Sequence, residues 1–310
     1  MNNFKKIWFA RATALFLLTI AVSCEDVIDV ELQETETRLV VNGLLRVDLN
    51  QEFIPVEIRV TETTNFFDSN VPTSLEDNAT IIYGRVNPDA PEILDIDPNN
   101  FSSSLTELEP GSGIYVPDPS FDADQRIRTS SIFPNTVFIL IMEHKGRRYS
   151  ARAPFSPAVP IDNIEQGDET LFDEDDIELK ITITDTPDID NYYVFDFQDG
   201  EFLALDDQFI DGQEFEFSYF PDRDLEPGEE IEVSLLGADL EFFNYMDLLV
   251  EQTQNDGGVF ETPAATVRGN IFDVTGLDNT ILFDNVNRPD AFPLGYFAVV
   301  QEFKQTITIE

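Results

Sequence analysis

Residues 177–184 read IELKITIT, and this alternation is the feature that predicts the fold class. Its four apolar side chains fall on one face and its Glu, Lys and Thr side chains on the other, because successive residues of a strand point to opposite sides. We therefore predict a half-buried strand, with residues 192–197 as its hairpin partner. Residues 214–219 and 230–236 alternate in the same way, so the second half of the chain is predicted to be a β domain.

The first half of the chain carries the same signal. Residues 53–61 alternate, and residues 38–47, RLVVNGLLRV, are apolar on both faces, as in a strand buried within a sandwich. Three more stretches complete the predicted strands: residues 79–86, 136–143 and 147–153, the last two joined by a turn at residues 144–146. We expect an immunoglobulin-like β-sandwich over residues 24–155.

Residues 87–121 are rich in Pro, Asp, Asn and Ser and have no sustained periodicity. We expect a long excursion over the surface. A segment of this length is either a partner-facing region or a poorly ordered loop, and the sequence favours neither interpretation.

Three prolines, Pro154, Pro157 and Pro160, place a domain boundary after the sandwich, because proline at this density breaks strands. Residues 156–310 then form a second antiparallel β domain with one helix near residues 240–254. Asp239 is a suitable N-cap for that helix, and its apolar stripe is expected to close the end of a sheet. The last predicted strands are residues 298–303 and 306–309.

The first residues predict an export signal. Lys5, Lys6 and Arg11 precede an apolar run over residues 12–22, and Ala21-Val22-Ser23 stands directly before Cys24. We interpret residues 1–23 as a lipoprotein signal peptide and Cys24, the only cysteine, as the lipidated residue. The alternative is a fortuitous cysteine near an ordinary cleavage site. The eleven apolar residues are too few to span a membrane.

The charge of the chain excludes several kinds of partner. Lys and Arg number 18 against 61 Asp and Glu, and removal of the signal leaves 15 against 61, a formal charge of −46. Nucleic acid is excluded because phosphate binding requires a basic stripe. An anionic lipid surface would also repel such a body, so the lipid at Cys24 has to hold it. With 27 Phe and 42% hydrophobic residues, the chain has enough apolar side chains for a folded core.

The chemistry that the sequence offers is limited. The only histidine, His144, falls at a predicted turn and is interpreted as exposed, so Ser-His-Asp, Cys-His and zinc sites are not expected. We predict no catalytic, cofactor-binding or metal-ligating residues. For the acids near residues 185–191 (Asp185, Asp188, Asp190 and Asn191) and at 173–176, structural calcium is the alternative to a solvated acidic face.

Aromatic residues are dense in the second half, and not all of them are expected to point inward. They either anchor glycans or partner proteins, or fill the two sheets, and the second interpretation is favoured for most. The residues concerned are Tyr192, Tyr193, Phe215, Phe217, Tyr219 and Phe220.

Several stretches in both halves of the chain form a recognisable succession: residues 27–30 (VIDV), 38–43 (RLVVNG), 206–212 (DDQFIDG), 241–245 (EFFNY) and 294–297 (LGYF). Together they resemble a Bacteroidetes lipoprotein family catalogued as domain of unknown function 4249. The pair Glu25-Asp26 after Cys24 also resembles the signal that sends such lipoproteins to the outer face of the outer membrane.

The resemblance implies a cell-envelope lipoprotein associated with TonB-dependent outer-membrane receptors, and it brings no catalytic residue. We therefore expect an accessory binding or docking lipoprotein of a TonB-dependent nutrient uptake system, without enzyme activity, anchored at the cell surface rather than on the periplasmic face. The alternatives are a structural or adhesive surface lipoprotein and, less favoured, a carboxylate-dependent hydrolase. The ligand is not identified by the sequence.

Overall fold

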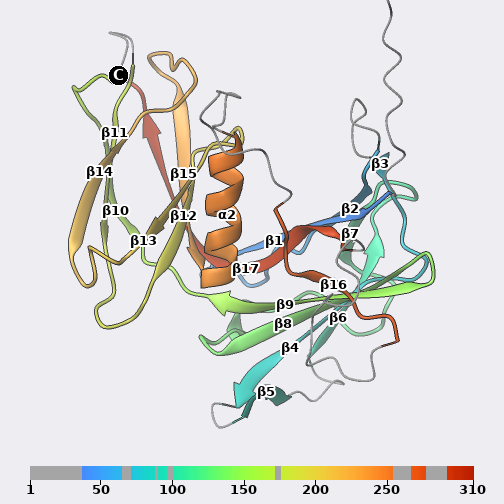
Figure 1. Cartoon of the computed structure of the whole chain (residues 1–310). Coiled ribbons are helices and arrows are strands. Elements are labelled where there is room, and N and C mark those ends of the chain that lie inside the picture. The colour runs from blue at the N-terminus through green and yellow to red at the C-terminus, as the bar shows by residue number, and fades with distance from the viewer. Residues whose placement is uncertain are drawn as a thin grey trace, which may run out of the picture. The chain divides into compact units, whose positions relative to one another are not determined.

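The computed structural model describes residues 37–64, 71–87, 90–95, 101–171, 176–253, 267–276 and 292–310. The predicted signal peptide, residues 1–23, and Cys24 lie outside these ranges. Residues from Thr37 to Glu310 form one compact unit, which is mainly β, as predicted, with a single α-helix in its described part (Figure 1).

Eight strands form a closed sheet in which each strand pairs with the next and the last returns to the first, in the order β17-β1-β2-β7-β6-β4-β8-β9. Their bounds are β1 Leu39–Val47, β2 Ile58–Glu62, β4 Thr80–Asn87, β6 Ser102–Glu107, β7 Ile114–Pro117, β8 Thr136–His144, β9 Arg147–Ser156 and β17 Leu294–Thr308. Short additions are β3 Val71–Pro72, β5 Ala90–Asp95, β16 Ile271–Asp273 and the 3-10 turn η1 Thr129–Ser131.

The inside of the closed sheet is filled by apolar side chains contributed by nearly every strand. Among the fully buried ones are Val41, Leu45, Ile58, Ile81, Leu105, Phe138, Leu140 and Phe297. Gly43 stands within β1 because a Cβ there would lie 2.7 Å from Ile58 Cδ1 and 2.9 Å from Phe297 Cδ2. The packing therefore explains why this buried strand contains a glycine.

Two smaller sheets pack against each other in the second half of the chain. One contains β10 Ile161–Gln166, β11 Leu179–Thr184 and β14 Glu214–Tyr219; the other contains β13 Phe202–Asp206, β12 Tyr192–Asp196, β15 Glu230–Ala238 and the end of β17. They enclose a second core that includes Ile181, Ile183, Tyr193, Phe195 and Val233. We call this part the sandwich.

The C-terminal strand β17 belongs to both parts. Its first residues run parallel to β1, with Val40 opposite Leu294, and its last residues run antiparallel to β15, with Ile231 opposite Ile307. The helix α2, Leu240–Thr253, packs beside this strand through Phe242 and Met246, which cluster with Tyr296 and Val300. The N-cap prediction is confirmed, because Phe242 N–H donates to Asp239 Oδ1 over 2.7 Å.

The immunoglobulin-like sandwich expected over residues 24–155 is not confirmed. The strands of this range instead close into one sheet with the help of β17, which comes from the other end of the chain. Periodicity within residues 24–155 carries no information about a partner strand so distant in sequence.

Two local predictions were wrong. Residues 87–121 are not one surface excursion, because β6 and β7 belong to the closed sheet and bury Leu105 and Tyr115. The strands β11 and β12 are not a hairpin, since β11 pairs with β10 and β14 while β12 pairs with β13 and β15. Residues 298–303 and 306–309 are parts of the single strand β17.

Candidate functional site

Two loops meet at one end of the sandwich. Residues 185–191 join β11 to β12, and residues 207–213 join β13 to β14. The register brings them together, because Tyr192 at the start of β12 lies opposite Asp206 at the end of β13. We call residues 185–191 and 207–213 the acidic tip, since five of them are aspartates and none is Lys or Arg.

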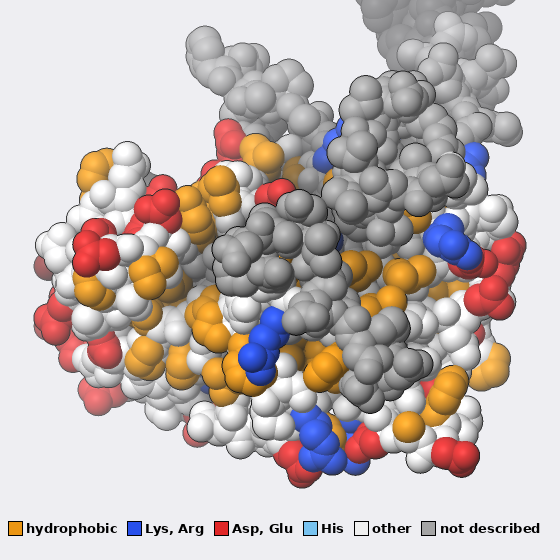
Figure 2. All heavy atoms as spheres, turned by 90° about the horizontal axis from the view of Figure 1, so that it is seen from below, with side chains coloured by type: hydrophobic (Ala, Val, Ile, Leu, Met, Phe, Trp, Pro, Cys, Tyr) orange, Lys and Arg blue, Asp and Glu red, His pale blue; other side chains and the backbone are white. Residues whose placement is uncertain are grey.

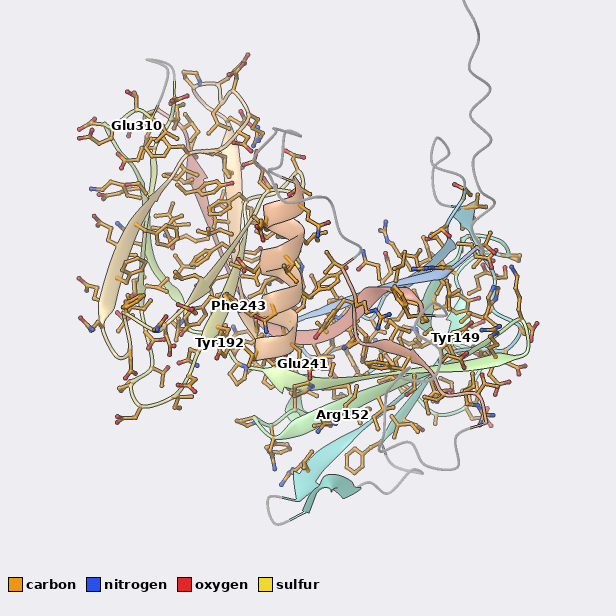
Figure 3. All side chains as sticks on the ribbon, viewed as in Figure 1. Tyr149, Arg152, Tyr192, Glu241, Phe243 and Glu310 are labelled. Carbon is orange, nitrogen blue, oxygen red and sulfur yellow. The ribbon has the colours of Figure 1, made fainter. Side chains whose placement is uncertain are left out.

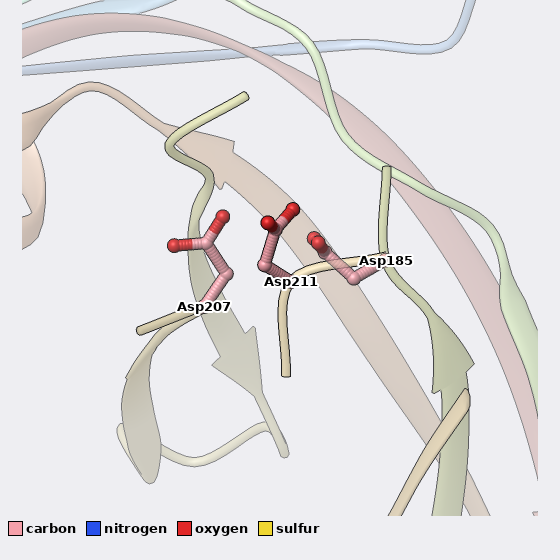
Figure 4. A group of neighbouring side chains, drawn as sticks. All are labelled: Asp185, Asp207 and Asp211. Atoms are coloured by element: carbon pink, nitrogen blue, oxygen red, sulfur yellow. The ribbon is translucent and has the colours of Figure 1, made fainter. Parts of the chain in front are cut away.

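Three carboxylates tie the two loops together (Figure 4). Asp185, Asp207 and Asp211 each offer an oxygen atom, and these atoms lie within 4.8 Å of one another. Asp185 accepts hydrogen bonds from the Tyr193 hydroxyl and from Gly212 N–H, the latter over 2.9 Å. These side-chain bonds add to two backbone bonds between the loops, from Asp185 N–H to Gln213 C=O over 3.0 Å and from Asp207 N–H to Asn191 C=O over 3.2 Å.

The other two carboxylates make further links between the loops. Asp207 accepts a hydrogen bond from Asn191 N–H over 2.7 Å, and Asp211 accepts one from Asp188 N–H over 2.9 Å. Asp185 and Asp207 are buried, with exposed fractions of 3% and 7%, whereas Asp211 is exposed. Each link joins one loop to the other, so the tip is held as a unit.

Burial and mutual repulsion dominate the electrostatics of this cluster. The pKa of Asp207 is raised, first by loss of hydration and then by the charges of Asp185 and Asp190, although the Asn191 N–H bond opposes the shift. Burial and the hydrogen bond to Asp185 also raise the pKa of Tyr193. The Tyr193 hydroxyl therefore stays a proton donor to Asp185 at neutral pH.

Three carboxylates at this spacing are oxygen ligands of the kind that Ca²⁺ prefers. The set differs from the one proposed from sequence, because Asp207 and Asp211 join Asp185, while Asp188 contributes its N–H and not its carboxylate to the network. Residues 173–175 of the second acidic run lie outside the described residues. Since N–H and O–H donors already bind Asp185 and Asp207, the hydrogen bonds alone account for the cluster.

The acidic tip also presents apolar side chains to solvent. Phe209 is 83% exposed and Ile189 is 57% exposed, one on each loop. Ile210 points the other way and is buried in the sandwich core. Phe209 was not among the predicted functional residues; its signal in the sequence is a phenylalanine inside the polar turn DDQFIDG, where a core residue is not expected.

Most of the aromatic residues considered from sequence fill the sandwich. Tyr193 is fully buried, and Phe215, Phe217 and Tyr219 pack against the same core. Tyr192 is half-buried near the tip, where its ring centroid lies 5.1 Å from that of Phe243 at the start of α2 (Figure 3). The aromatic side chain that the tip exposes is therefore Phe209, which is not one of the aromatic residues considered from sequence.

His144 is not the exposed turn residue that was predicted. It is 5% exposed at the end of β8, and its Nε2 lies 2.9 Å from Glu62 Oε1 on β2. The turn itself consists of Lys145 and Gly146, both at positive φ, and Lys145 also binds Glu62. The imidazole therefore packs between strands as part of the closed sheet.

None of the helices among the described residues is both long and apolar enough to cross a membrane.

Comparison with known proteins gives one match. A family model described as Domain of unknown function (DUF4249) matches residues 25–278, which is more than four fifths of the chain. No curated protein matches the chain.

Proposed function

The chain belongs to the DUF4249 family, and we propose that it is a lipid-anchored docking protein that works beside a TonB-dependent receptor in the outer membrane of a Bacteroidetes-type bacterium. Family membership assigns no activity by itself. The observation that carries the proposal is the acidic tip, where a hydrogen-bonded frame of aspartates holds an 83% exposed phenylalanine in solvent. Exposed aromatic side chains on ordered loops are typical anchors for a partner.

The anchor is proposed from the sequence. The residues Ala21-Val22-Ser23 before the only cysteine, Cys24, support cleavage and acylation there. Each methylene that enters the bilayer contributes about 0.8 kcal/mol, so two or three acyl chains hold the protein on the membrane. We place the folded part on the cell surface rather than in the periplasm.

Binding is favoured over catalysis because the side chains considered for chemistry among the described residues hold structural positions. The only histidine is buried between strands, and Asp185 and Asp207 accept hydrogen bonds within the loop frame. A glycosidase needs two carboxyl groups that flank a bound sugar, one of them free to protonate it. A carboxylate-dependent hydrolase is therefore the less favoured proposal.

The first test concerns the anchor. We expect the wild-type chain to incorporate radioactive palmitate and to fractionate with the outer membrane, and Cys24→Ser to lose both properties. Ser23→Ala is the matched control and should be labelled normally, because a small residue is retained before the cysteine. Labelling of Cys24→Ser would contradict the lipid anchor.

The second test concerns the role. The receptor is identified first, by its co-purification with the protein in mild detergent. Deletion of the gene for this protein should then reduce uptake of the nutrient that the receptor carries, and the wild-type gene should restore uptake. Normal uptake combined with lost attachment between cells would favour the adhesive alternative. Release of sugar or peptide by the purified protein would favour the hydrolase.

A further inference from the structure

We infer that the acidic tip is the docking surface itself, and that it fits a protein surface with an apolar pocket surrounded by Lys and Arg. This inference rests on the proposed docking function and names the site and the chemistry of the partner. Two neighbouring residues of the tip point in opposite directions: Ile210 is buried in the sandwich core, whereas Phe209 is 83% exposed.

The backbone of the Phe209 loop is fixed before any partner arrives. Ile210 N–H donates to Asp207 C=O and Gln213 N–H donates to Ile210 C=O, each over 2.8 Å, and Gly212 takes the positive φ of 66° that closes the turn. The buried Ile210 pins the same turn to the core. Presenting the phenyl ring therefore costs little additional ordering on binding, which is the main reason that preorganised loops bind well.

A second apolar side chain extends the surface. Ile189 is 57% exposed, and the loop that carries it is joined to the Phe209 loop by the bond from Asp188 N–H to Asp211. Leu240, at the start of α2, is 52% exposed at the same end of the sandwich, because Ala238 lies opposite Tyr192. An aromatic side chain with aliphatic neighbours is the usual composition of an interface centre.

The charges around these side chains specify the partner. Between Lys180 and Arg223 the chain contains twelve Asp and Glu and no Lys or Arg. Asp188, Asp190 and Asp211 are exposed on the tip beside Ile189 and Phe209. In Figure 2, Asp and Glu dominate the charged side chains at the left of the face, over the sandwich, while most Lys and Arg lie at its centre and right. A partner that buries Phe209 has to offer positive charge at the rim.

The same charges argue against other occupants. An anionic lipid surface and a nucleic acid would both be repelled. A second copy of this chain would place two acidic tips against each other, and like charges across an interface cost affinity. A basic protein surface is the occupant that the tip fits.

The experiment places a photoreactive phenylalanine analogue at position 209 of the full, lipidated chain in intact cells. The matched control carries the analogue at position 121, because Phe121 is also exposed, at 51%, in a segment of the closed-sheet part. We expect position 209 to crosslink to one envelope protein, at a peptide flanked by Lys and Arg, and position 121 not to do so. Crosslinks only to lipid, to a second copy, or equally from both positions would overturn the inference, as would none at all.

Affinity for that protein, once purified, gives the quantitative test. Phe209→Ser should weaken binding at least about tenfold, and Phe121→Ser should leave it unchanged. Asp188→Asn with Asp190→Asn should slow association and reduce its salt dependence, whereas the exposed pair Asp77→Asn with Asp122→Asn should not. Equal effects of the tip and control variants would contradict a docking site at the tip.

Failure of the site can be distinguished from failure of the function. If deletion of the gene abolishes uptake but Phe209→Ser and the tip double variant restore it fully, the docking role stands and the tip is not its surface. If deletion has no effect on uptake while position 209 still crosslinks to a basic envelope protein, the tip is an interface of another process.

Discussion

Residues 24–155 carry ten Lys and Arg against 23 Asp and Glu, a formal charge of −13, whereas residues 156–310 carry five against 38, a formal charge of −33. The first range supplies seven of the eight strands of the closed sheet, and the second supplies the sandwich. Both parts bury continuous apolar cores, so the difference lies in how each part accommodates its acids.

In the closed-sheet part, several acids pair with arginines at the surface. Arg59 binds Glu57 over 2.7 Å, and Arg126 binds Asp124 over 2.9 Å. The acidic tip instead satisfies its carboxylates with backbone N–H groups and a tyrosine hydroxyl. Exposed ion pairs contribute little to stability, whereas buried carboxylates that organise a loop contribute more. The carboxylates of the tip are therefore part of its architecture, whereas those of these two ion pairs lie at the surface.

The largest expected effects come from the two cores. Phe195→Ala in the sandwich and Phe138→Ala in the closed sheet each remove a fully buried ring and should each cost about 3–5 kcal/mol of unfolding free energy in urea titrations. Hydrogen exchange should then lose protection first in the part that carries the substitution. Uniform loss throughout Thr37–Glu310 in both variants would show one cooperative unit and remove the distinction.

The next effect compares a framework carboxylate with a surface carboxylate. Asp185→Ala leaves the buried Tyr193 hydroxyl and Gly212 N–H without their acceptor, so we expect a loss of about 2–3 kcal/mol. Glu57→Ala removes an exposed partner of Arg59 and should change stability by less than about 0.5 kcal/mol. Thermal unfolding monitored by circular dichroism measures both. Equal losses would mean that the tip acids are no more structural than the rest.

A smaller effect is expected where an arginine of the closed sheet binds a carboxylate of the sandwich. Arg46 on β1 binds Asp196 on β12 and, over 3.0 Å, Glu302 on β17. Loss of hydration acts against its charge, but the two carboxylates outweigh it and raise the pKa of Arg46. Arg46→Met should cost about 1–2 kcal/mol because it leaves the poorly exposed Asp196 without a cation and Glu302 with Lys304 alone, 3.8 Å away. Arg59→Met is the control at an exposed pair, and an equal effect there would show that position between the parts does not matter.

The sequence predicted local elements well and their partners poorly. Alternation located β11, β14 and β15, and the N-cap Asp239 located α2, because these signals depend on neighbours within a few residues. The pairing of β1 with β17 joins Val40 to Leu294, and no periodicity connects positions so far apart. The closed sheet could not be predicted for that reason.

The candidate site shows the same division. The acidic turn at Asp185 was recognised from sequence, but its partners Asp207 and Asp211 come from another loop that only the strand register brings near. His144 was misplaced because a turn residue and the last residue of a strand look alike in sequence, and the buried contact with Glu62 comes from β2.

The smallest expected effect is a change in stability that has opposite signs at Asp124 in the closed-sheet part and at Asp207 in the tip. The pKa of Asp124 is lowered from 3.8 to about 2, chiefly by the hydrogen bond from Arg126, whereas burial raises the pKa of Asp207 above 3.8. A carboxyl group whose pKa is lowered by folding stabilises the folded state at pH values above its ordinary pKa, and this contribution is lost as the pH falls toward 2. A carboxyl group whose pKa is raised by folding lowers the stability of the folded state as the pH rises past 3.8.

Asp124→Asn should therefore be slightly less stable than the wild type at pH 7, and Asp207→Asn slightly more stable, since an asparagine oxygen can still accept the Asn191 N–H bond. Both differences should shrink in acid, as measured by urea unfolding between pH 7 and pH 3. The Asp207 difference should disappear below its ordinary pKa of 3.8, whereas part of the Asp124 difference should persist there. If both variants shifted stability in the same direction, acids of the tip and of the surface would share one environment, and charge alone would distinguish the two parts.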